Sequence, residues 1–139
     1  MFEYFNSDAV AVIMQAQREA RQLGQNFVGT EQLLLGLLGN RTTKAAQILQ
    51  QSGLELEEAR SEIKNLVGQG QPSRMTDVPL TPKTKRVLEQ ALSESRRLNS
   101  SSVLPEHILL TLTRTKDSVA IKIMENLGVD PDAVEEIVV

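Results

Sequence analysis

The stretches GTEQLLLGLL (29–38) and LPEHILLTLT (104–113) are two versions of one apolar phrase, and each has a glutamate at its third position. When residues 5–64 are aligned with residues 80–139, no gap is needed and 14 of the 60 pairs are identical. A constant offset of this kind indicates an internal duplication, in which neither unit can bury its apolar face alone. The chain is therefore predicted to consist of two similar halves packed together.

Each copy is predicted to form four helices. The phrase at 29–38 has leucines on nearly all sides of a helix axis, so this second helix is expected to be buried among the others. The first helix has an apolar stripe at spacings of four and three residues, made of Ala9, Ile13, Ala16, Ala20 and Leu23. The fourth helix has a similar apolar side, made of Leu56, Ala59, Ile63, Leu66 and Val67. The third and fourth helices are expected near 43–51 and 56–67, and those of copy two near 82–98, 105–113, 117–126 and 131–139.

Polar residues at the expected helix starts predict N-caps, because their side-chain oxygens accept hydrogen bonds from free backbone N–H groups. The candidate caps are Asn6, Thr30, Thr81 and Asp130. Gly24 and Gly53 are expected to end the first and third helices, since glycine adopts the left-handed conformation that terminates a helix.

The two copies, repeat one at 5–67 and repeat two at 80–139, are joined by a polar connector that contains glycine and proline at 68–79. This connector is too short to hold the halves far apart. The predicted fold class is therefore all-α: one domain, residues 1–139, built as a pseudo-twofold bundle of about eight helices with the connector crossing its surface.

Composition excludes several classes of protein. Hydrophobic residues make up 40% of the chain, which is enough for a packed core, and the absence of cysteine rules out disulfides and thiolate metal sites. The formal net charge of −3 gives no basic footprint for nucleic acid. No apolar run approaches the roughly 20 residues needed to span a membrane, and the N-terminus has no signal-peptide pattern. We expect a cytoplasmic protein without a cofactor.

No constellation of catalytic residues is visible. The one histidine, His107, stands at a helix start and is interpreted as a surface or capping residue rather than a general base. One histidine without cysteine gives no transition-metal site, and no phosphate-binding loop or nucleophile motif appears. An acidic cluster is interpreted as a solvated helix face: Glu55, Glu57, Glu58 and Glu62. The chain is predicted not to be an enzyme, and acid–base catalysis by Glu31 or Glu106 is the rival hypothesis.

Glu31 and Glu106 are equivalent by the repeat, and each lies in the first turn of its central helix. Carboxylates there stabilise the helix by about 0.3–1 kcal/mol, which alone explains them. A second interpretation is that the pair receives guanidinium groups while the free N–H groups of the helix starts receive an anion. The charged grooves between the copies are the expected docking surface.

Two stretches, LGQNFVGTEQLLLGLL (23–38) and TPKTKRVLEQAL (81–92), resemble the Clp N-terminal repeat domain. The resemblance is nearest to ClpC-type AAA+ unfoldases of bacteria and plastids, and it covers essentially the whole chain. Copy two departs from the family pattern, because Leu104-Pro105-Glu106 stands where Gly-Thr-Glu is expected.

The resemblance implies a protein-interaction module of the Clp protease and chaperone system. In that family the domain precedes two ATPase modules and docks adaptors and substrates, which the ATPase ring unfolds and threads into the ClpP protease. The implied partners are Clp ATPase and protease components, adaptors, and unfolded or marked substrates. Neither nucleic acid nor a membrane is an expected partner. The implied compartment is the cytoplasm or the plastid stroma.

The resemblance also implies a phosphoarginine site. Some members bind phosphorylated arginine through the glutamate of each Gly-Thr-Glu phrase and a threonine at the start of each copy. Glu31, Glu106 and Thr81 match that pattern, Thr30 lies within the first phrase, and Asn6 replaces the first threonine.

Two forms of such a protein fit the sequence. The chain is expected to be the N-terminal domain cut from a ClpC-like ATPase, because the last helix of copy two is shorter than its counterpart in copy one. The alternative is a free-standing accessory protein that binds the Clp protease core or ATPase and modulates its assembly. A third hypothesis, a purely structural lid, predicts binding without an effect on degradation.

Overall fold

The computed structural model describes residues 1–72, 74 and 76–139. Within these residues the chain forms eight α-helices and no strand, which confirms the predicted all-α class. A short 3₁₀ helix, Phe2–Tyr4, precedes them. The first four helices are α1 Ser7–Leu23, α2 Thr30–Gly39, α3 Lys44–Gln51 and α4 Leu56–Val67, and the next four are α5 Pro82–Arg97, α6 Pro105–Arg114, α7 Val119–Asn126 and α8 Pro131–Val138.

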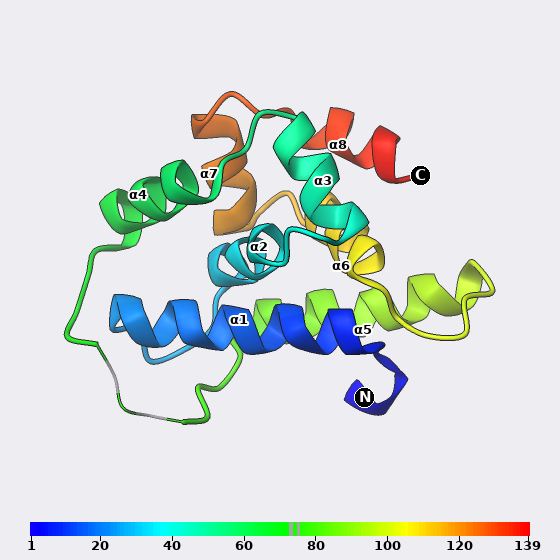
Figure 1. Ribbon diagram of the computed structural model, residues 1–139, viewed down its shortest axis with the longest axis horizontal. Coiled ribbons are helices and arrows are strands. Elements are labelled where there is room, and N and C mark those ends of the chain that lie inside the picture. Colours follow the sequence, from blue (N-terminus) through cyan, green and yellow to red (C-terminus); the bar gives the residue numbers. More distant parts are fainter. Residues whose placement is uncertain (73, 75) are drawn as a thin grey trace.

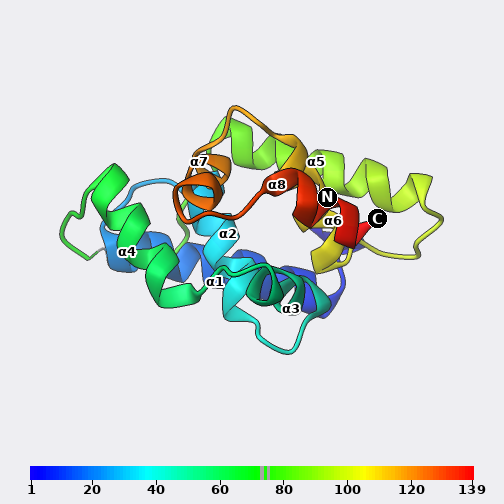
Figure 2. The same cartoon turned by 90° about the horizontal axis from the view of Figure 1, so that it is seen from above.

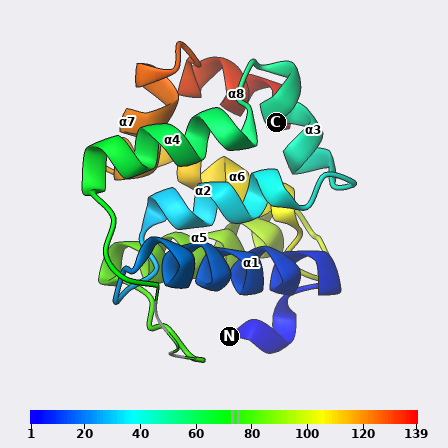
Figure 3. The same ribbon diagram turned by 60° about the vertical axis from the view of Figure 1, so that its left-hand side comes forward.

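The helices are stacked in three levels (Figures 1 and 3). The two longest helices, α1 and α5, form the lowest level, α2 and α6 the middle level, and the four shorter helices α3, α4, α7 and α8 the upper level. Figure 2, seen from above, shows the upper helices arranged around α2 and α6. Helix α2 contacts α1 and all of α3 to α7, so the phrase that opened the sequence occupies the centre of the molecule.

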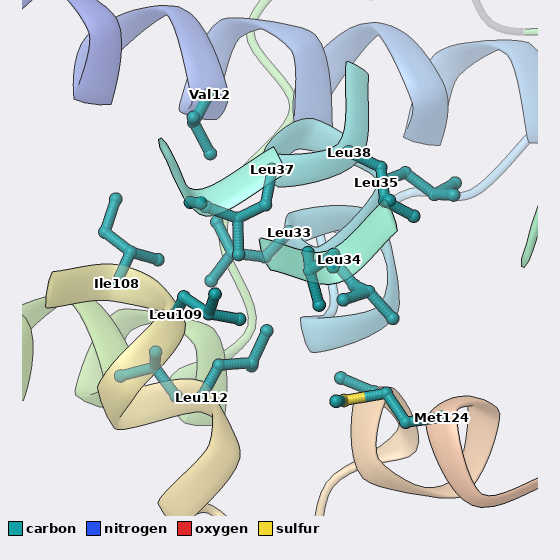
Figure 4. Packing of buried hydrophobic residues seen from close by; sticks show 14 of the residues in the cluster. Val12, Leu33, Leu34, Leu35, Leu37, Leu38, Ile108, Leu109, Leu112 and Met124 are labelled. Atoms are coloured by element: carbon teal, nitrogen blue, oxygen red, sulfur yellow. The ribbon is translucent and has the colours of Figure 1, made fainter. Parts of the chain in front are cut away.

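The core is built from the apolar side chains of the two central helices. Some of the leucines of α2, Leu34 among them, point toward α6 and α7, where Leu109, Leu112 and Met124 lie, whereas Leu35 points away from them (Figure 4). Leu34 and Leu109 are both fully buried. Burial of a leucine contributes about 1.5–3 kcal/mol, so these contacts dominate the stability of the bundle. The prediction that the second helix is buried on all sides is confirmed.

Two isolated backbone bridges relate the copies by their pseudo-twofold symmetry. Phe5 pairs with Val103, and Leu80 pairs with Val28. Phe5 and Leu80 are equivalent positions under the 75-residue offset, and so are Val28 and Val103. The start of each copy therefore pairs with the loop that precedes the central helix of the other copy. The exact limits of the repeats, 5–67 and 80–139, stay predictions.

The N-caps agree with the sequence except at one position. The side chains of Asn6, Thr81 and Asp130 accept hydrogen bonds from backbone N–H groups at the starts of α1, α5 and α8. Thr30 is not a cap: the N-cap of α2 is Gly29, and Thr30 is the first helical residue. The prediction was wrong because the Thr30 hydroxyl is used elsewhere, accepting a hydrogen bond from the N–H of Ala120 in α7.

One residue of the predicted apolar stripes lies outside the core. Leu66 keeps 38% of its surface exposed, whereas Ala59 and Ile63 of the same helix are fully buried. Position 67, four residues after Ile63, returns to the buried side, and Val67 packs against the core there. Leu66 lies on the same side, three residues after Ile63, but it stands in the last turn of α4, where residues 64–66 are exposed.

The described part of the connector runs along the C-terminal half of α1. The N–H of Gly70 donates to the carbonyl of Leu23 (2.9 Å), and Arg21 donates to the carbonyl of Thr76 (3.2 Å). Gly24 has φ 77°, and a Cβ there would lie 2.4 Å from the backbone of Gly70. Glycine at position 24 thus both ends α1 and lets the connector approach it.

Candidate ligand-binding site

A cavity of about 370 Å³ lies between the two copies, where the starts of α2, α5 and α7 converge. Its residues come from both repeats, because the chain entering α2 pairs with the residues that precede α5. The lining residues are Gln25, Asn26, Phe27, Gly29, Thr30, Glu31, Gln32, Thr81, Lys83, Asp117 and Val119. Three of the five residues predicted as binding residues, Thr30, Glu31 and Thr81, therefore share one site.

The start of α2 is fixed by hydrogen bonds on both sides. The N–H of Gly29 donates to the Oε1 of Gln32 (2.7 Å), and the N–H of Ala120 donates to the Thr30 hydroxyl (3.2 Å). The first bond closes the N-terminal turn on itself, while the second ties it to α7 of the other copy. These two hydrogen bonds fix the wall of the cavity that α2 supplies.

Glu31 is a buried carboxylate on this wall. Its exposed fraction is only 9%, and burial raises its pKa above the ordinary value of 4.5, with a backbone hydrogen bond acting in the opposite direction. The side chain lies over Gly29: a Cβ there would come within 2.2 Å of the Glu31 Oε1. No basic group of the described residues lies within ion-pair distance of this carboxylate. A cationic ligand would supply the missing partner.

The opposite side of the cavity is the start of α5. The N–H of Thr81 donates to the carbonyl of Val28 (3.0 Å), and its hydroxyl accepts from the N–H of Thr84 (3.1 Å) and donates to the Thr84 Oγ1 (2.8 Å). The Thr81 hydroxyl is therefore engaged in capping α5. At the rim, the Lys83 ammonium pairs with Asp117 (3.1 Å), and this bond lowers the pKa of Asp117.

The other two predicted residues, Asn6 and Glu106, lie at the symmetry-related place and not in this cavity. The N–H of Asn6 donates to the carbonyl of Val103 (3.0 Å), as Thr81 does to Val28, and its side chain caps α1. Glu106 is half-buried on α6. Pro105 stands where copy one has Thr30, so this helix start has lost an N–H and a hydroxyl. The two symmetry-related places are thus chemically different.

The structure confirms that His107 is a capping residue. Its Nδ1 accepts a hydrogen bond from the N–H of Leu104 (2.9 Å), the same bond that Gln32 makes to Gly29 in copy one. The ring is buried rather than at the surface, and burial lowers its pKa although the nearby Glu106 acts to raise it. A neutral imidazole bound to the backbone holds the helix start in shape.

Sequence reasoning missed Phe27, Gln32, Lys83 and Asp117 as parts of the site. Gln32 follows Glu31 directly and shares its phrase, so its position gave a signal. Asp117 lies in a loop of the other copy, and no sequence pattern brings it to α2.

The described residues contain no group of three or more His, Asp or Glu side chains placed to hold a metal ion. None of the helices described has both the length and the apolar character that a membrane span requires.

Paired copies of a four-helix unit with a charged cavity between them define a helical repeat domain. Residues 4–127 and 87–138 match the family model of the Clp repeat N-terminal domain, and the chain belongs to this family. The matched residues cover both copies, so the resemblance first seen in two short stretches extends over the whole fold.

Among its relatives, the chain is 49% identical over 131 residues to the chloroplastic ClpA homolog of Brassica napus, an ATP-binding subunit of the ATP-dependent Clp protease. It is also 49% identical over 131 residues to the chloroplastic chaperone protein ClpC1 of Arabidopsis thaliana. Each match covers 94% of this chain but only 15% and 14% of the respective relative. The chain thus spans about one-seventh of the length of these proteins.

Solved structures share the fold. The N-terminal domain of the chaperone ClpD from Arabidopsis thaliana superposes with a TM-score of 0.87 at 29% identity, covering 99% of this chain and 96% of that one. The ClpV N-domain in complex with a VipB peptide gives a TM-score of 0.72 at 19% identity, covering 97% and 84%. The second likeness concerns the fold alone.

Proposed function

We propose that this chain is a protein-docking module of the Clp protease and chaperone system, which holds adaptors or substrates for an AAA+ unfoldase. The observation that carries the proposal is membership of the Clp repeat N-terminal domain family, together with a charged cavity between the repeats. A ClpV N-domain of the same fold has been captured with a peptide, which supports a peptide-binding role for the fold. The chloroplastic relatives support the plastid stroma as the compartment, and the cytoplasm expected from the sequence is the alternative.

Docking is tested by affinity capture. The immobilised chain is expected to retain Clp ATPase subunits, Clp protease subunits or a Clp adaptor from a native extract, identified by mass spectrometry, and to hydrolyse no ATP by itself. Beads carrying the heat-unfolded chain control for binding to exposed apolar surface. Recovery of no Clp subunit, adaptor or unfolded client would contradict the proposal.

The proposed ligand of the cavity is a phosphorylated arginine side chain. Glu31 is a buried carboxylate without a cationic partner among the described residues, so a guanidinium would relieve an unfavourable charge. The start of α2 supplies the positive end of a helix dipole, which favours an oxyanion. Since Pro105 alters the equivalent helix start, we propose one such site per chain, on the side of Glu31.

Glu31→Gln is expected to weaken phosphoarginine binding by about 10- to 100-fold, the equivalent of one hydrogen bond to a charged group. The thermal unfolding temperature should be unchanged or higher at neutral pH. The raised pKa means that the folded state binds the Glu31 proton more tightly than the unfolded chain, so ionisation of Glu31 opposes folding above that pKa. Titration followed by amide chemical shifts and by calorimetry measures both quantities.

Glu106→Gln is the matched control and should change the affinity much less, because its helix start lacks the N–H that Pro105 removes. Wild-type affinity should fall with decreasing pH as Glu31 becomes protonated, beginning above the ordinary range of a glutamate. A wild-type spectrum that does not change at millimolar phosphoarginine would exclude the site.

A further inference from the structure

Among the described residues, the side-chain amide of Gln32 is an unusual polar group. Only 1% of this residue is exposed, yet it lines the cavity between the copies. Its Nε2 is a buried side-chain donor without a hydrogen-bond partner in the part of the chain that the structure describes. Buried donors are almost always satisfied, and leaving one unpaired is unfavourable by about 1–3 kcal/mol. A bound ligand that accepts a hydrogen bond from Nε2 would account for this exception.

The orientation of the amide is fixed by its other end. Oε1 accepts from the N–H of Gly29 at 2.7 Å, and exchanging the two ends would place an NH₂ group against that N–H. The Nε2 donor is therefore held in one direction by the same hydrogen bond that caps α2. Capping of α2 uses only the acceptor Oε1. The donor Nε2 has no hydrogen-bond partner among the described residues.

We propose that Gln32 determines the ligand specificity of the cavity by donating from Nε2 to an oxygen of the bound oxyanion. This inference rests on the phosphoarginine site proposed above and assigns a division of roles within it. Glu31 receives the guanidinium, while the adjacent Gln32 recognises the phosphoryl oxygens that distinguish phosphoarginine from arginine. Glu31 and Gln32, which are adjacent at the start of α2, would thereby bind the positive and the negative group of one phosphoarginine side chain.

Copy two indicates which substitution of Gln32 can serve as a control. His107 occupies the position equivalent to Gln32 and accepts the N–H of Leu104 through Nδ1. A neutral histidine that accepts at Nδ1 carries its proton on Nε2, which makes Nε2 a donor. Histidine at position 32 can therefore preserve both the cap and the donor. Gln32→Glu preserves the cap but replaces the donor with an acceptor of negative charge.

The test compares free phosphoarginine and free arginine binding by calorimetry at pH 8 for wild type, Gln32→Glu and Gln32→His. We expect Gln32→Glu to weaken phosphoarginine binding by at least about tenfold, a loss in line with one charged hydrogen bond, without weakening arginine binding. Gln32→His should stay within about threefold of wild type. If Gln32→Glu fails to fold in thermal unfolding, Gln32→Met, which has no donor, replaces it with the same expected loss.

The outcomes separate the two levels of the proposal. Wild type that does not bind phosphoarginine overturns the proposed site and this inference together. Wild type that binds, with Gln32→Glu or Gln32→Met binding equally well, overturns the role of Gln32 and leaves the site intact. Equal losses for phosphoarginine and arginine would also overturn it, because they would mean that Gln32 merely shapes the cavity.

Discussion

Leu34→Ala and Leu109→Ala are each expected to lower the free energy of unfolding by about 2–5 kcal/mol. Both side chains are fully buried, one on each central helix, in the layer where α2 and α6 meet (Figure 4). Truncation removes the burial of three carbon atoms and leaves a cavity that neighbouring helices cannot close without breaking their other contacts. Domains of this size have only about 5–15 kcal/mol of stability, so either change should be large.

Urea-induced unfolding followed by circular dichroism measures this loss. Leu66→Ala is the matched control: the same substitution is made in a helix, but the side chain is 38% exposed, and we expect a change below about 1 kcal/mol. A loss at Leu66 equal to that at Leu34 would contradict the assignment of the core. The comparison also tests whether Leu66 lies outside the core.

Gly36→Ala is expected to lower stability by about 3 kcal/mol, the upper end of the usual range for overpacking. A Cβ at position 36 would lie 2.3 Å from the carbonyl oxygen of Val12, so α1 and α2 would have to move apart along their contact. Alanine favours a helix over glycine by about 1 kcal/mol, which offsets part of the loss. Chemical denaturation of the variant gives the difference directly.

Gly39→Ala, at the last position of the same helix, is the matched control. Its Cβ would approach the Cγ of Gln15 at 3.2 Å, a flexible side chain that can turn away. We therefore expect Gly39→Ala to change stability by less than about 1 kcal/mol. A neutral Gly36→Ala would mean that the close approach of α1 and α2 contributes little.

The contact between α5 and α6 in copy two differs from the equivalent contact between α1 and α2. Thr111 stands at the position equivalent to Gly36. Its hydroxyl lies 3.2 Å from the carbonyl of Val87, the residue equivalent to Val12, and 3.1 Å from the carbonyl of Ile108 in its own helix. A glycine permits close backbone approach in copy one, whereas in copy two a threonine places its hydroxyl against the equivalent backbone carbonyl. Neither solution could be predicted from the duplication, because each depends on the distance between helices.

Charged contacts between helices have diverged in the same manner. In copy one the buried Glu19 of α1 receives Arg60 of α4 through two hydrogen bonds of 2.7 and 3.0 Å. In copy two the equivalent residues are Glu94 and Glu135, which would repel each other, and Arg114 lies between them at 2.8 Å from each. The positively charged partner has moved from one helix to another while the link between the outer helices is kept.

The sequence by itself determined the helices, the caps of α1, α5 and α8, and the doubling of the fold, because apolar periodicity and capping chemistry act within a few residues of the chain. It also determined which residues are candidates for binding, since Glu31 and Glu106 stand at helix starts. The tertiary structure decided how the candidates are grouped. The cross-pairing of Val28 with Leu80 joins the Glu31 helix start to Thr81 of the other copy, and no local pattern contains that information. It likewise decided that Glu31 is buried and that the amide donor of Gln32 has no partner among the described residues, because burial and hydrogen-bond satisfaction depend on which surfaces meet after the chain has folded.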